Sequence, residues 1–218
     1  MAEPVLFYLR PSHYCISAER MLSYKGIPFR QVNVPYHDKR ELIRETQQDY
    51  VPALRWNGDV VTWTQVADFL EETKPRPSLF PGRHHGLPAA LASWAHGLLE
   101  ERVWRLVVTR MPSVFDDEVE RWVFEEMQTR ARGSFSVLAS REAEFREDLG
   151  TYLALLNDVV AEQPWMLGEP SLADFATFGA LGPLALVGER LPRDLRSLIR
   201  WHEAVAAIPS TRISSGRS

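Results

Sequence analysis

The dipeptide Asn57-Gly58 restricts the fold of this chain more than any other feature. It lies between two runs, 50–56 and 59–62, that suit extended backbone. Asparagine followed by glycine accepts positive φ at both central positions of a two-residue turn. The sequence therefore predicts a β-hairpin whose two antiparallel strands lie at the edge of a sheet.

A helix is predicted directly after the hairpin. Thr62 stands three residues before Gln65, which is the spacing of a capping box. Val61 and Val66 occupy the two positions of a hydrophobic staple. The helix is therefore expected to begin at Trp63, and its free N–H groups are expected to form a small anion site at the exit of the hairpin.

The chain before the hairpin alternates between strand and helix signals. An apolar run of strand length comes first, Ser12 can cap the helix that follows, and Gly26 supplies the residue that ends it. The predicted elements are strands at 4–9 and 29–34 and helices at 12–25, 39–46 and 63–72. With the hairpin, the order is βαβαββα, and the first two strands are expected to be parallel.

A proline-rich segment separates this part from the rest of the chain. Pro75, Pro77 and Pro81 exclude a helix or a central strand there. The expected parts are a first domain at 1–76, a linker at 77–85, a second domain at 86–209 and a polar, frayed tail at 210–218. His84-His85 in the linker has no third ligand nearby in the sequence, so no metal site is predicted.

Every long segment beyond the linker repeats apolar residues at helical spacing. The run Leu149, Tyr152, Leu153 and Leu156 is one example, so the second domain is predicted to be all-α. Ser171 stands three residues before Asp174, which predicts a second capping box at the start of a helix that is buried on most sides.

Together these patterns resemble the glutathione transferase family. The resemblance rests on Val51-Pro52 at the opening of the hairpin, on the capped helix after it, and on the Ser-Leu-Ala-Asp segment at 171–174 with a closing helix behind it. It implies an α/β thioredoxin-like domain followed by an all-α helical domain. It also implies that Pro52 is cis and that the Val51 backbone pairs with the cysteinyl part of glutathione.

The same resemblance assigns a catalytic position at the start of the first helix. Free N–H groups and the helix dipole stabilise a thiolate there. The segment reads Pro11-Ser12-His13-Tyr14-Cys15, which looks like a Cys-x-x-Cys motif whose first cysteine is serine. In the serine-type members this hydroxyl donates a hydrogen bond to the glutathione sulfur. The alternative role for Ser12 is that of an N-cap alone.

Two other residues compete for the catalytic role. Cys15 is the only thiol in the chain, but it falls three residues further into the helix, where a partly buried, structural cysteine is expected. Tyr8, at the end of the first strand, occupies a place that resembles the tyrosine of the tyrosine-type members. Its alternative role is that of a core aromatic with a hydrated hydroxyl.

The segment Thr62-Trp63-Thr64 departs from the family pattern. The family usually carries an acid or glutamine followed by serine here, and these residues hold the γ-glutamyl group. No acid is present at 62–64, so Trp63 is either a stacking surface or a covered aromatic. The substrate-binding candidates are Lys39, Val51, Pro52, Trp63, Thr64, Trp104 and Met111. For Lys39 the alternative is a solvated helix face, and for Trp104 and Met111 it is a place in the core.

Composition narrows the possible partners. The net charge of −4 and a pI near 5.9 argue against a nucleic-acid partner, which requires a concentrated basic surface. The single cysteine excludes an internal disulfide framework, and the absence of a secretory pattern at the start indicates a cytoplasmic protein. The most apolar region, 172–187, is too short and too interrupted to span a membrane.

Three functions remain open at this point. The first is a cytoplasmic, homodimeric detoxification transferase that conjugates glutathione, its co-substrate, to a small apolar electrophile through Ser12. The second is a glutathione transferase-fold protein that binds ligand without turnover. The third is a glutathione-dependent thiol oxidoreductase that uses Cys15. The homodimer and the co-substrate are implied by the resemblance.

Overall fold

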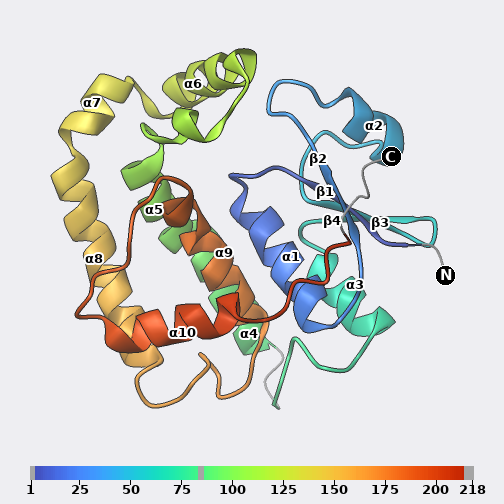
Figure 1. Cartoon of the computed structure of the whole chain (residues 1–218). Coiled ribbons are helices and arrows are strands. Elements are labelled where there is room, and N and C mark those ends of the chain that lie inside the picture. The colour runs from blue at the N-terminus through green and yellow to red at the C-terminus, as the bar shows by residue number, and fades with distance from the viewer. Residues whose placement is uncertain (1–2, 83–85, 214–218) are drawn as a thin grey trace.

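The computed structural model describes residues 3–82 and 86–213. Figure 1 shows a small sheet with its helices, built from the first part of the chain, beside a larger group of helices built from the rest. The glutathione transferase-like architecture expected from the sequence is therefore confirmed: a thioredoxin-like domain comes first and a helical region follows.

The first part follows the predicted βαβαββα order. Its elements are β1 (Val5–Tyr8), α1 (His13–Tyr24), β2 (Arg30–Asn33), α2 (Arg40–Thr46), β3 (Ala53–Trp56), β4 (Asp59–Thr62) and α3 (Val66–Thr73). The sheet order is β2-β1-β3-β4, with β1 parallel to β2 and antiparallel to β3. The parallel pairing of the first two strands was predicted and is confirmed.

The elements from Gly86 to Ala206 are all helical. They are α4 (Gly86–Trp94), the π-helical turn η1 (Ala95–Leu99), α5 (Glu100–Val107), the short 3-10 turn η2 (Met111–Val114), α6 (Glu118–Arg132), α7 (Phe135–Ser140), α8 (Glu142–Val159), α9 (Leu172–Leu186) and α10 (Arg196–Ala206). In Figure 1 the helix α9 runs through the middle of this group and lies beside α1.

The hairpin forms where Asn57-Gly58 predicts it. Asn57 has a φ of 53° and Gly58 a φ of 96°, and β3 and β4 pair antiparallel on either side of them. Both residues therefore use the positive φ that made this dipeptide informative.

The helix after the hairpin begins later than predicted. It starts at Val66, whereas Trp63 was expected to be its first residue. The Oε1 of Gln65 accepts hydrogen bonds from both the backbone N–H (3.5 Å) and the hydroxyl (3.1 Å) of Thr62. Because the Thr62 hydroxyl is directed to the Gln65 side chain, it caps no backbone N–H, and residues 63–65 form a turn.

Helices α1 and α9 approach each other unusually closely at Gly179. A Cβ atom at this position would lie 2.5 Å from the carbonyl oxygen of His13, closer than real Cβ atoms pack. Glycine is therefore required there, and the contact holds the first turn of α1 against the centre of the helical region.

The predicted capping box of α9 is present and wholly buried. The carboxylate of Asp174 accepts hydrogen bonds from the N–H (3.0 Å) and hydroxyl (2.8 Å) of Ser171. It also accepts from the N–H of Met166 (2.9 Å) and from Nε1 of Trp201 (2.8 Å). The box thus connects α9 to α10 and to the loop before α9.

The structure describes only part of the expected linker (77–85) and of the expected tail (210–218). Residues 83–85, which include His84-His85, lie outside the described residues, as do residues 214–218 of the expected tail. The domain boundary within 77–85 stays a prediction. Residues 211–213 are not frayed. The N–H of Ile213 donates to the carbonyl of Phe29 (2.9 Å), and the hydroxyl of Thr211 donates to the carbonyl of Ile27 (2.6 Å).

In the part of the chain that the structure describes, no helix is long and apolar enough to cross a membrane.

Candidate functional site

Ser12 lies at the N-cap of α1. Its Oγ accepts a hydrogen bond from the N–H of Cys15 at 3.3 Å, and its own N–H donates to the carbonyl of Leu9 at 2.9 Å. Ser12 remains half-buried, and accepting a hydrogen bond does not use its hydroxyl proton, which can be directed to the Cys15 sulfur or to a bound anion. The capping role and a donor role toward a bound anion are therefore compatible.

Cys15 is fully buried behind this turn. Its Sγ accepts a hydrogen bond from the N–H of Leu9 at 3.4 Å. Burial raises the pKa of the Cys15 thiol to about 12, which outweighs the hydrogen bonds that favour the thiolate. The thiol is consequently protonated at neutral pH and has no open path to a substrate.

Two separate cavities border the residues chosen from the sequence. The first, which we term the Trp63 cavity, has a volume of about 410 Å³ and is lined by Tyr14, Pro52, Trp63, Thr64, Asp68, Ala89, Ser93 and His96 among others. The second, the Tyr8 cavity, has a volume of about 670 Å³ and is lined by Tyr8, Arg10, Asn33, Phe115 and Phe178 among others. Of the sequence candidates, Pro52, Trp63 and Thr64 line the first cavity and Tyr8 lines the second. Ser12 and Cys15 line neither.

The Trp63 cavity lies between α1, the hairpin, α3 and α4. The Val51-Pro52 bond is cis, as the resemblance implied, and Pro52 lines the cavity wall. Trp63 and Thr64 contribute from the turn after β4. A volume of this size falls within the range of about 300–1,000 Å³ that is usual for small-molecule sites.

Aromatic rings form one wall of this cavity. The ring of Tyr14 lies 4.1 Å from that of Trp63 and 4.3 Å from that of His96, measured between centroids. Trp63 is 39% exposed, so one part of its ring packs on Tyr14 and the rest faces solvent. The Trp63 side chain is therefore both a packed aromatic and an accessible surface.

Tyr8 lies in the core at the end of β1. Burial raises the pKa of its phenol well above the ordinary value, with a smaller contribution from Glu19. The side chain lines the Tyr8 cavity, away from Pro52 and Trp63, so the structure does not bring Tyr8 together with the hairpin residues.

Several other candidates line neither cavity. Met111 is buried in the core, and the half-buried ring of Trp104 contacts Phe124 edge to face at 6.1 Å. Lys39, just before α2, is half-buried, and Val51 packs against the small core on the α2 side of the sheet. Across residues 3–82 and 86–213, no group of three or more His, Cys, Asp or Glu side chains is arranged to hold a metal ion.

The structure adds residues that the sequence reading missed. Asp68, in the first turn of α3, places an exposed carboxylate at the Trp63 cavity, where no acid was expected. His96, in η1, reaches the same space from the other side. Asp68 lies beyond the segment 62–64 in which an acid was sought. His96 stands four residues before Glu100 in the sequence, but only the packing of α4 and η1 against the first domain brings it to the cavity.

Comparison with known proteins agrees with this geometry. Residues 6–78 match the family model described as glutathione S-transferase, N-terminal domain. Among curated proteins no sequence matches this chain. Residues 6–78 are therefore similar to the N-terminal domain of the glutathione S-transferases, and a helical region follows them.

Solved structures share the fold over nearly the whole chain. Glutaredoxin 2 from Salmonella typhimurium, in complex with glutathione, is 19% identical, with a TM-score of 0.78 and 95% of each chain covered. A glutathione S-transferase from Ceriporiopsis subvermispora, also in complex with glutathione, is 15% identical, with a TM-score of 0.79 and coverage of 99% of this chain and 100% of that one. A glutathione S-transferase from Rhodospirillum rubrum is 18% identical, with a TM-score of 0.76 and coverage of 99% and 93%.

Proposed function

We propose that this protein binds glutathione in the Trp63 cavity and conjugates it to a small apolar electrophile, with Ser12 stabilising the thiolate. The observation that carries the proposal is that Tyr14, Pro52 and Thr64 line one space. They come from the start of α1, the entrance of the hairpin and its exit. These are the three segments to which the resemblance assigns glutathione.

The neighbouring structures support the same ligand. Two of them, a glutaredoxin and a glutathione S-transferase, were solved in complex with glutathione. The ligand carries an amine, two carboxylates and a thiol. In this chain Asp68 offers a carboxylate to the amine, and the turn at 63–65 together with the start of α3 offers backbone N–H groups to a carboxylate.

Ser12 supplies the chemistry in this account. A thiolate placed at the N-terminus of α1 meets the positive end of the helix dipole and the proton of the Ser12 hydroxyl. No proton has to leave the serine. The hydrogen bond favours the ionised sulfur, which is the nucleophile that attacks the electrophile.

A protein that binds glutathione without turnover is the second candidate. The observation that favours it is the wall of the cavity: Trp63 stands where the family usually carries a polar pair, and its ring packs on Tyr14. Such a protein binds glutathione but shows no conjugation with any electrophile. An oxidoreductase that uses Cys15 is disfavoured by the complete burial and high pKa of that thiol.

Blocking the cavity tests the binding site. Ala89 and Ala90 are neighbours on α4 and both exposed, but only Ala89 lines the Trp63 cavity. We expect glutathione at a hundredfold excess over its dissociation constant to stabilise the wild type by about 2.7 kcal/mol in a thermal-shift titration. Ala89→Trp should abolish this stabilisation and Ala90→Trp should retain it. Equal behaviour of the two variants would place the ligand elsewhere.

We also propose a cytoplasmic homodimer, which the resemblance supports. Sedimentation at micromolar concentrations tests it, with a species of twice 25.0 kDa expected. A single species of 25.0 kDa across that range would exclude the dimer.

A further inference from the structure

Three titratable side chains meet beside Ser12. His13 follows Ser12 in the first turn of α1, and its Nδ1 lies 3.6 Å from Oε1 of Glu100 in α5. The His13 ring lies 5.1 Å from that of His96, which belongs to the π-helical turn η1. Because Gly179 holds the first turn of α1 in place, these groups are packed together by the fold. We call His13, His96 and Glu100 the imidazole–carboxylate cluster.

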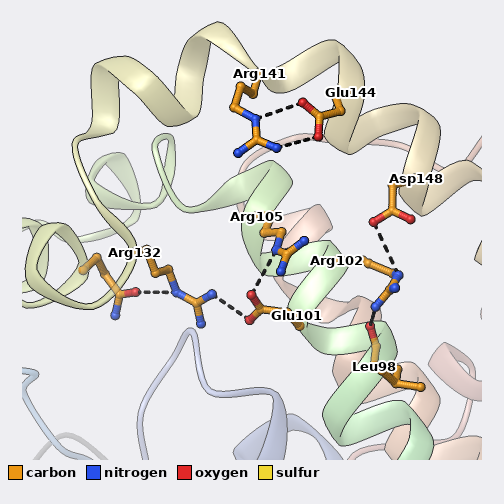
Figure 2. A network of polar contacts seen from close by, with 9 residues as sticks. Leu98, Glu101, Arg102, Arg105, Arg132, Arg141, Glu144 and Asp148 are labelled. Carbon is orange, nitrogen blue, oxygen red and sulfur yellow. Dashed lines mark hydrogen bonds and ion pairs between the residues drawn. The ribbon is translucent and has the colours of Figure 1, made fainter.

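The polar atoms of the cluster have few partners. Among the described residues, Nε2 of His13 and Nδ1 of His96 are buried without a hydrogen-bond partner. Glu100 pairs with no arginine or lysine in the same set, whereas its neighbour Glu101 binds Arg132 (2.7 Å) and Arg105 (3.0 Å), as Figure 2 shows. The nearby guanidinium groups therefore bind Glu101, and the carboxylate of Glu100 pairs with His13 instead.

Burial gives these groups unusual protonation. It lowers the pKa of His13 to about 3, with a smaller effect from His96, and lowers that of His96 to about 4. It raises the pKa of Glu100 to about 7; Arg132 opposes this rise and Glu101 adds to it. Tyr14, the other titratable group that faces the cluster, keeps its proton, because burial and Glu100 raise the pKa of its phenol. At neutral pH both imidazoles are therefore uncharged.

The cluster borders the proposed ligand site. His96 and Tyr14 line the Trp63 cavity, and the Tyr14 ring lies 4.0 Å from that of His13. An imidazole whose Nδ1 faces a carboxylate holds its proton on that nitrogen and presents the lone pair of Nε2, which is the arrangement of a general base with its orienting carboxylate.

We propose that the imidazole–carboxylate cluster takes up the proton that bound glutathione loses when its thiol ionises beside Ser12. This inference rests on the proposed function and adds the fate of the proton to it. A thiol that ionises must pass its proton to an acceptor, and the structure provides one next to the hydroxyl that stabilises the sulfur.

The transfer balances as follows. The S–H bond of glutathione breaks, Nε2 of His13 gains that proton, and Nδ1 passes its own proton to the Glu100 carboxylate. The thiolate then forms a bond to carbon of the electrophile, whose leaving group departs with the bonding electron pair. When the product leaves, Nε2 of His13 releases its proton to solvent and Glu100 returns a proton to Nδ1, which restores the starting tautomer. Protonation also removes the negative charge of Glu100 while the thiolate is bound.

Proton counting tests the proposal. Calorimetry of glutathione binding in two buffers of different ionisation heat gives the protons released, and ultraviolet absorbance gives the thiolate formed. In the free protein at a pH of about 8 Glu100 is ionised, and the negative charge of a bound thiolate raises the pKa of Glu100 further, so that it keeps the transferred proton. We therefore expect the wild type to release less than half a proton per thiolate at that pH. Glu100→Gln and His13→Gln should release about one. Glu126→Gln, which removes an exposed partner of Arg130 on α6, should behave as the wild type.

The outcomes separate the two proposals. Release of one proton per thiolate by the wild type overturns this inference and leaves the proposed function intact. Failure of the wild type to bind glutathione overturns the proposed function and this role with it. In the free wild type, imidazole resonances of His13 and His96 should shift together near pH 7 as Glu100 titrates. Absence of that shared shift also overturns the inference, even if the substituted proteins do not fold.

Discussion

The Nζ of Lys25 donates a 2.7 Å hydrogen bond to Oε2 of Glu71, although the lysine side chain has no exposed surface. The same ammonium donates to the carbonyl oxygens of Lys74 (2.6 Å) and Pro77 (2.9 Å). Lys25 thereby connects the end of α1 with the end of α3 and with the segment that leads to α4. Its charge is fully paired in a place where an unpaired charge would be very costly.

Replacing Lys25 should destabilise the fold strongly. Lys25→Met removes all three hydrogen bonds and leaves Glu71 without its cation, so we expect the free energy of unfolding to fall by about 3 kcal/mol. Lys74→Met is the matched control, because the one hydrogen bond of the Lys74 side chain among the described residues is an exposed 3.3 Å contact with the carbonyl of Gly26. Urea unfolding should show a loss under about 1 kcal/mol for the control. Equal losses would contradict the clamp role of Lys25.

Asp174 should be equally important to the helical region. Asp174→Ala leaves the N–H groups of Met166 and Ser171 and the indole of Trp201 without an acceptor in the core. We expect a loss of about 3 kcal/mol or more, since each unsatisfied buried donor costs about 1–3 kcal/mol. Glu144→Ala, at an exposed pair with Arg141, should cost less than about 1 kcal/mol. Chemical unfolding followed by tryptophan fluorescence measures both.

The pH dependence of stability should reveal Glu100. Burial raises its pKa from 4.5 to about 7, so the folded state holds an extra proton between these values. Stability from this group is therefore lost as the pH rises through that window. Glu100→Gln does not lose this stability. The free energy of unfolding of Glu100→Gln minus that of the wild type should therefore rise by on the order of 2 kcal/mol between a pH of about 4 and a pH of about 8. His13 and His96 are present in both proteins, so their opposite contributions cancel in the comparison. A difference that does not vary with pH would exclude the raised pKa.

Asp68 should contribute to glutathione affinity. Because its carboxylate is exposed, an ion pair with the ligand amine is worth about 1 kcal/mol at most. Asp68→Asn should thus weaken binding by roughly fivefold, raising KM for glutathione and leaving kcat unchanged. Asp59→Asn, at the exposed start of β4, is the control and should alter neither. A fall in kcat without a change in KM would exclude this role for Asp68.

The sequence predicted the parts of the fold that depend on local chemistry. The hairpin at Asn57-Gly58, the caps of α1 at Ser12 and Gly26, and the box at Ser171 each follow from a few adjacent residues. The start of α3 was missed because Thr62 prefers the Gln65 side chain to a backbone partner, which a spacing rule does not detect.

Other features depend on contacts between distant segments. Lys25 is the last residue of the helix predicted at 12–25, and its partners become visible only when α1 and α3 are packed together. Glu100 and His96 share a face at a spacing of four residues, which the sequence shows, but His13 joins them only through the packing of α1 on the helical region. The Trp63 cavity has the same origin, since α4 closes it from beyond the linker.

The ionisation of bound glutathione tests the central claim most directly. Thiolate absorbance of the complex, followed across pH, gives the pKa of the bound thiol in the wild type, Ser12→Ala and Cys15→Ala. One charge-assisted hydrogen bond is worth about 1.5–3 kcal/mol, so Ser12→Ala should raise this pKa by about one to two units and lower the conjugation rate at neutral pH roughly ten- to hundredfold. Cys15→Ala should leave both nearly unchanged. A thiol pKa that is unaffected by Ser12→Ala, or activity that disappears with Cys15→Ala, would contradict the account.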